Sequence, residues 1–69
     1  MAYIVLEIQS NNGHVATIVN DYVDKNQAES KFHQILTAAA ISTVPVHSAV
    51  LLTDTGRTMK DETYIHENE

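Results

Sequence analysis

The chain has 69 residues, no cysteine, and nine acidic side chains against four basic ones, for a net charge of −5. The composition excludes disulfides and thiolate metal sites, and the acidic balance argues against direct binding to nucleic acid, which needs a basic surface. The longest apolar stretch is far below the roughly 20 residues that span a bilayer, and the start of the chain does not resemble a signal peptide, so we expect a cytoplasmic protein without membrane contact.

The length predicts one small domain. We place it at residues 1–66 and expect residues 67–69 to form a flexible acidic tail. A domain of this size buries only about 60% of its unfolded surface. Small domains usually compensate for the low stability of such a core with disulfides, a structural metal or oligomerisation. The four histidines form no close pair of the zinc-motif kind, so self-association is the expected support.

The first predicted element is a β-hairpin over Tyr3–Tyr22. Its first strand, YIVLEIQ, is rich in β-branched and large apolar residues. Asn11-Asn12-Gly13 predicts a three-residue connection with Gly13 in the left-handed conformation. This loop length places Ile8 near Ala16, and a loop one residue shorter would turn the second strand over.

An amphipathic helix is predicted to follow. Asp24 is the expected N-cap, with Gln27 as its reciprocal partner, and Pro45 excludes helix beyond Val44. The apolar stripe recurs at helical spacing and consists of Ala28, Phe32, Ile35, Leu36, Ala39 and Ala40.

A second hairpin closes the domain. The strand VHSAVLLT leads through the turn Asp54-Thr55-Gly56 into RTMKDETYIH. A three-residue loop would place His47 near Thr63 and Leu51 near Met59.

These elements predict an α+β fold of order ββαββ. A right-handed crossover and the apolar character of the first and third strands give a four-stranded antiparallel sheet of order 2-1-3-4, with the helix on one face. The last strand, which carries Lys60, Asp61 and Glu62, suits an edge.

One helix covers only one face of such a sheet. We expect the helix to lie over Ile4, Leu6 and Ile8, with Ala16 and Ile18 beside them. The other face then exposes an apolar patch larger than a monomer normally leaves in water. A two-fold homodimer packed sheet to sheet is the first choice of cover, and a ring of three is the alternative. The predicted interface consists of Tyr3, Val5, Val15 and Val19.

Asp54-Thr55-Gly56 resembles the catalytic signature of aspartic proteases, in which two such loops meet and share a proton. The viral-type members are homodimers of small subunits. However, the chain is shorter than such a subunit, and its only glycines are Gly13 and Gly56, so the later glycine element of that family is missing. A hairpin turn is the preferred interpretation.

His47 and Tyr64 are the candidate ligand-site residues. A histidine in a strand can carry a proton or bind a ligand, but His47 has no partner visible in the sequence, so a structural role is preferred. Ser48 lacks the glycine-flanked elbow of a nucleophile. No catalytic, cofactor-binding or metal-binding residue is assigned, and whether histidines of different subunits meet around a metal is left open.

The stretches MAYIVLEIQ and ESKFHQILTAAAISTVPVHSAVLL resemble small uncharacterised proteins of Gram-positive gut bacteria and their prophages. The resemblance covers Ala2 to about Tyr64. It implies a cytoplasmic bacterial or phage setting and provides no activity to carry over to any residue.

Two functional hypotheses follow. The first is a non-enzymatic, self-associating protein that acts through protein–protein interaction, without a cofactor. Its acidic surface could imitate DNA toward a DNA-binding protein if residues such as Glu62, Glu67 and Glu69 lined one face. The second is a small oligomeric enzyme or ligand-binding protein with sites at subunit boundaries, using Tyr3, His47 or Tyr64.

Overall fold

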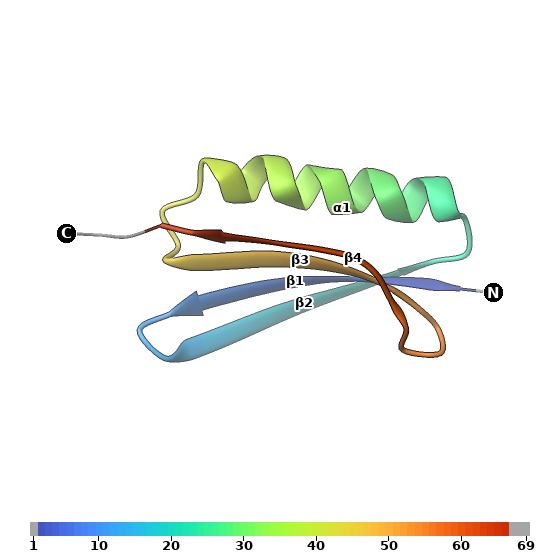
Figure 1. The fold of residues 1–69 in the computed structure, drawn as a ribbon, viewed down its shortest axis with the longest axis horizontal. Helices are drawn as coiled ribbons and strands as arrows, with labels where there is room; N and C mark the ends of the chain where they lie inside the picture. Colours follow the sequence, from blue (N-terminus) through green and yellow to red (C-terminus); the bar gives the residue numbers. More distant parts are fainter. Residues whose placement is uncertain (1, 67–69) are drawn as a thin grey trace.

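A computed structural model describes residues 2–66, and the expected tail at 67–69 lies outside this range. The fold is one helix laid along one side of a four-stranded sheet (Figure 1). The elements are β1 (Tyr3–Asn11), β2 (His14–Tyr22), α1 (Lys25–Ala40), β3 (Val46–Thr53) and β4 (Thr58–Ile65).

The strand order is β2-β1-β3-β4, and all three neighbouring pairs are antiparallel. This confirms the predicted ββαββ topology. The two central strands, β1 and β3, are the two most apolar, and the charged strand β4 is at an edge. The order therefore gives each of the two apolar strands a neighbouring strand along both of its edges.

The first turn has two residues rather than the predicted three. Asn11 pairs with His14, and both Asn12 (φ 52°) and Gly13 (φ 85°) have positive φ. Two positive φ angles define the type I′ turn that Asn-Gly favours, because its twist matches that of the strands. As a result Ile8 lies opposite Thr17, and the predicted pairing of Ile8 with Ala16 was wrong. Ala16 and Ile18 still lie on the face that the helix covers, as predicted, because the prediction for β1 is reversed as well.

The second hairpin contains a β-bulge. The predicted register holds beside the turn, where Leu52 lies opposite Thr58, and then shifts by one residue so that Leu51 lies opposite Lys60. His47 consequently lies opposite Tyr64 instead of the predicted Thr63. The extra residue bends and twists this edge strand.

The helix begins as predicted. Asp24 is the N-cap, and its carboxylate accepts a hydrogen bond of 2.9 Å from the backbone amide of Asn26. The predicted stripe is confirmed except at its end, since Ala40 is exposed. Its fully buried members are Ala28, Phe32, Ile35 and Ala39, and Leu36 packs against them.

The helix covers the opposite sheet face from the one expected. Val5, Ala49 and Leu51 lie beneath α1 with no exposed surface, and Tyr3 packs against this core. The prediction that Ile4, Leu6 and Ile8 face the helix was therefore wrong. β3 places His47, Ala49 and Leu51 on the face beneath α1, and its other face carries Val50 and Leu52.

The sheet face turned away from α1 is called the open face below. Alternation along each strand places sixteen residues on it. Five are serine or threonine, two are aspartate (Asp21 and Asp61), and both aspartates lie on edge strands. The apolar members are Ile4, Leu6, Ile8, Val15, Val19, Val46, Val50, Leu52 and Ile65.

Candidate functional site

The most polar feature of the interior is a carboxylate–imidazole pair beneath the helix. Nε2 of His47 on β3 lies 2.6 Å from Oε2 of Glu7 on β1. His47 is 4% exposed and is the one buried polar residue within residues 2–66. Glu7 also accepts a 3.0 Å hydrogen bond from Nε2 of Gln9. The carboxylate thus has two donors on the helix-covered face.

The register explains why these residues meet. Gln9 lies directly opposite His47, and Glu7 lies opposite Ala49. Glu7 and His47 are therefore diagonal neighbours on one face of an antiparallel pair, a separation that long side chains span. The small side chain of Ala49 leaves room for Glu7 to lean toward the imidazole.

The ionised form of Glu7 is favoured in this setting. Burial raises the pKa of its carboxyl, but the hydrogen bonds from His47 and Gln9 and the nearby charge of Lys31 lower it by more. The pKa therefore lies below its ordinary value of 4.5. Because an ionised carboxylate only accepts hydrogen bonds, Nε2 of His47 is the donor at neutral pH.

The other ring nitrogen of His47 determines what the pair can do. Nδ1 is buried and has no hydrogen-bond partner among the described residues. In a hydrolytic triad that nitrogen would face a nucleophilic hydroxyl. Ser48 is the adjacent hydroxyl in sequence, but it lies on the open face and donates a 3.0 Å hydrogen bond to Oγ1 of Thr63. The pair therefore has the geometry of a structural link between β1 and β3.

Glu7 has limited contact with solvent. Its side chain is 15% exposed and borders a shallow groove of about 240 Å³ along α1, whose other lining residues are Lys31, Gln34, Ile35 and Ala38. The groove admits water to the carboxylate and presents one cation, Lys31. It offers no convergent set of polar groups around His47.

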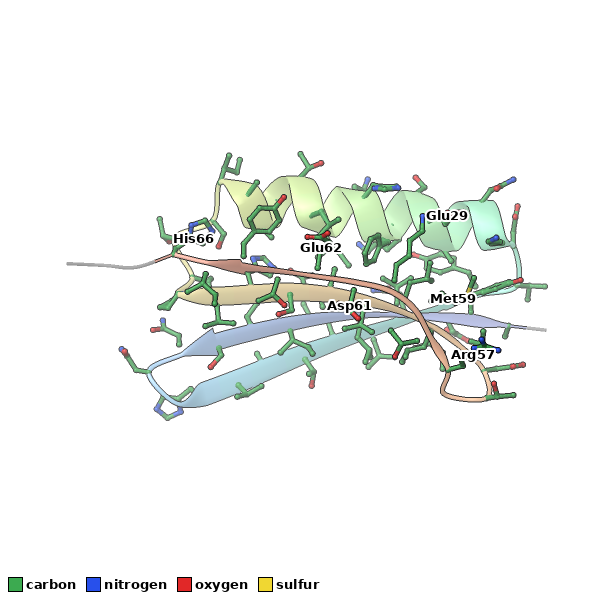
Figure 2. The ribbon with its side chains drawn as sticks, viewed as in Figure 1. Glu29, Arg57, Met59, Asp61, Glu62 and His66 are labelled. Atoms are coloured by element: carbon green, nitrogen blue, oxygen red, sulfur yellow. The ribbon has the colours of Figure 1, made fainter. Side chains whose placement is uncertain are left out.

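Tyr64 lies beside His47 in the neighbouring strand, so the structure does bring the two candidate residues together. Tyr64 is 36% exposed and stacks on His66, with ring centroids 6.4 Å apart. Nε2 of His66 in turn donates a 2.7 Å hydrogen bond to the carbonyl of Ala39, at the end of α1 nearest to the end of β4 (Figure 2). This contact fixes the end of β4 against the helix.

A second groove of about 440 Å³ runs between α1 and β4. Phe32, His33 and Leu36 line its helix side, and Glu62 and Tyr64 line its strand side. Lys60 also borders it and makes a 2.8 Å ion pair with Glu29 on α1. Figure 2 shows Glu62 directed toward α1 and Asp61 directed away from it. The groove mixes one exposed ion pair with apolar walls and shows no catalytic arrangement.

The predicted interface residues are divided between the two sheet faces. Val5 is fully buried under the helix and has no surface to offer a second chain, and Tyr3 lies on the same face. Val15 and Val19 lie on the open face and are 65% and 62% exposed. The sequence reasoning placed Leu6 on the helix-covered face and left the face of Val50 open, whereas the two lie opposite each other at the centre of the open face.

Glu7 is the residue of the polar pair that sequence reasoning missed. The available signal was that the apolar strand YIVLEIQ contains an acidic residue, two positions after Val5 and therefore on the same side of the strand. A carboxylate in such a strand needs a hydrogen-bonding partner if that face is covered. Its partner His47 is 40 residues away and is identified only by the register.

The turn Asp54-Thr55-Gly56 has a structural role. The backbone amide of Asp54 donates to the carbonyl of Ala2, and its carboxylate accepts from the amide of Ala2, both at 3.0 Å. Gly56 has φ 87°, the left-handed conformation expected of a glycine in this hairpin turn. Asp54 thus fastens the start of β1 to the end of β3.

Comparison with known proteins adds no assignment. No family matches this chain. No characterised protein and no solved structure matches it either. Within residues 2–66, no helix has the length and apolarity required to cross a membrane, and no three histidine or acidic side chains lie close enough to hold a metal ion.

Proposed function

We propose that this protein is a non-enzymatic, self-associating protein that acts through protein–protein contact, and that a second copy packs on its open face. The observation that supports the proposal is the one-sided position of the helix. α1 shields one side of the sheet, and the opposite side, with its nine apolar side chains, has no cover from the described chain (Figure 1).

The core beneath the helix is thin. Its fully buried apolar residues are Val5, Ala28, Phe32, Ile35, Ala39, Ala49 and Leu51, and three of these seven are alanine. An alanine contributes little apolar area compared with leucine or phenylalanine. A domain of this size with so small a core gains from burying its second apolar face against another chain.

The area of the open face is sufficient for a small dimer. Four strands of about eight residues give a footprint of about 26 Å by 19 Å, or roughly 500 Å² per chain, at about 3.3 Å per residue and 4.8 Å per strand. Two such faces bury about 1,000 Å², the minimum area expected of a biological interface. The apolar centre on β1 and β3, with polar residues on the outer strands, also matches interface anatomy.

The proposal is tested by measuring the mass of the assembly in solution. Light scattering and native mass spectrometry should find assemblies of two or more chains that dissociate on dilution. Val50→Lys at the centre of the open face should lower the assembly size, because a lysine there would be buried without a partner. Ser30→Lys on the exposed side of α1 makes the same charge change and should leave the mass unchanged.

Both substitutions reduce the net negative charge, so a loss of association in Val50→Lys alone cannot come from added repulsion. If Val50→Lys fails to fold, Val50→Thr keeps the shape and should weaken association in the same direction. A lone chain at every concentration would contradict the proposal, as would equal masses for wild type and both Val50 variants.

A further inference from the structure

The two outer strands of the sheet differ in how their free edges are protected. β4 carries a bulge and the consecutive charges Lys60, Asp61 and Glu62, the devices that prevent a sheet edge from pairing with another chain. β2 pairs with β1 over nine residues without a register shift. It contains no lysine, arginine or proline, and its one carboxylate, Asp21, is next to its end.

The backbone hydrogen bonds identify which groups of β2 are free. The amide of Asp54 bonds to the carbonyl of Ala2, which shows that even-numbered residues of β1 pair with β3. The odd-numbered residues of β1 therefore bond to β2, where their partners are even-numbered. The backbone amides and carbonyls of Val15, Thr17, Val19 and Asp21 consequently lie at the free edge.

We infer that β2 pairs with β2 of a second copy, antiparallel and in register about Ile18, to form a continuous eight-stranded sheet. This contact uses a different surface from the open face and stands independently of the proposed function. A two-fold axis through Ile18, perpendicular to the sheet, keeps both helices on the same side.

The strand is complementary to itself in this register. All nine residues of His14–Tyr22 find a partner, and the strands exchange hydrogen bonds at the Val15–Asp21 and Thr17–Val19 pairs. Ile18, which is 48% exposed in the single chain, meets its own copy across the axis. The two Asp21 carboxylates lie at opposite ends of the pair, six positions apart or about 20 Å, so the like charges do not oppose each other.

The protected β4 edge determines the size of the product. A sheet with two open edges could add chains without limit, whereas one open edge closes after two copies. Edge pairing therefore gives a dimer. Combined with packing of the open face, it gives an assembly of four chains.

Amide-resolved hydrogen exchange by NMR on the full chain tests the inference without a substitution. At a concentration where nine-tenths of the chains are paired, the amides of Val15, Thr17, Val19 and Asp21 should exchange about tenfold more slowly than in dilute solution. The amides of Asp61 and Thr63, at the free edge of β4, should remain unprotected. Packing through the open face alone leaves the β2 edge amides without partners, so it does not produce this pattern.

Proline substitution provides a second test of edge pairing. Thr17→Pro removes an edge amide that makes no bond to β1, so the hairpin should tolerate it while edge pairing is lost. Thr63→Pro is the matched control. It makes the same replacement at a position that lies level with Thr17 across the open face, but on the protected edge strand β4. Thr17→Pro should halve the assembly mass relative to Thr63→Pro.

The outcomes separate the two contacts. Edge amides that exchange freely in an assembly of two chains, with no effect of Thr17→Pro on its mass, overturn the edge inference and leave the open-face proposal standing. A dimer that Thr17→Pro dissociates and Val50→Lys does not would support edge pairing and overturn the open-face proposal. A lone chain at all concentrations overturns both.

Discussion

Glu7 and His47, 40 residues apart in the sequence, meet at 2.6 Å across the two central strands and beneath the helix. The pair links β1 to β3 on the sheet face that forms the apolar core. A buried polar group that loses its partner is strongly destabilising. The pair is therefore the most sensitive polar contact of the described fold.

Glu7→Gln should destabilise the chain by about 1.5–3 kcal/mol, the range for a hydrogen bond to a charged group. The substitution keeps the shape of the side chain but removes the charge that the donors of His47 and Gln9 stabilise. Urea unfolding followed by circular dichroism measures the change. Glu29→Gln, which removes the carboxylate of the exposed ion pair with Lys60, is the control and should leave the midpoint almost unchanged. Equal effects at both positions would refute a special role for Glu7.

The stability that Glu7 provides should depend on pH in a defined direction. Its pKa in the folded chain is below its ordinary value of 4.5, so the unfolded state binds this proton more readily. The contribution is complete above the unfolded-state pKa and is lost as the pH falls through the lower folded-state pKa. Unfolding curves of wild type and Glu7→Gln should therefore differ at pH 7 and converge in strong acid. A difference that persists unchanged at low pH would exclude the carboxylate as its source.

The topology of the sheet could be predicted from the sequence because several signals agree. The Asn-Gly turn, the capped amphipathic helix and the charges of β4 each restrict where an element can lie. The face of β1 that the helix covers was predicted wrongly, because Ile4, Leu6 and Ile8 form the more apolar alternation of YIVLEIQ, whereas α1 covers the alternation that contains Val5 and Glu7. The buried face also depends on how β1 pairs with β3, because Val5 is buried together with Ala49 and Leu51.

The candidate site shows the same limit. His47 stood out in the sequence as a polar residue in an apolar strand, and Tyr64 is indeed its neighbour on β4. The partner that defines its role, Glu7, depends on the register between β1 and β3. Because β2 and α1 separate these two strands in the chain, no hairpin turn indicates that register.

His47→Ala should destabilise the chain by about 2–4 kcal/mol, because it opens a cavity and leaves Glu7 without its main donor. The effect should not add to that of Glu7→Gln. A double-mutant cycle should give a coupling free energy of about 0.5–3 kcal/mol, as for residues in direct contact. Assembly mass should be unaffected in variants that remain folded, since neither residue lies on the open face or at the β2 edge. Additive effects would contradict the pairing.

Gly13→Ala should destabilise the chain by about 1–2 kcal/mol, the cost of placing a side chain in the left-handed conformation. A Cβ at Gly13 would meet no atom within 4 Å, so its φ of 85° is the only source of the penalty. Asn12→Gly, at the other positive φ of the same turn, is the control and should be close to neutral, because glycine adopts this conformation without strain. Thermal unfolding of the three proteins measures both effects. A neutral Gly13→Ala would contradict the left-handed conformation of Gly13 in this turn.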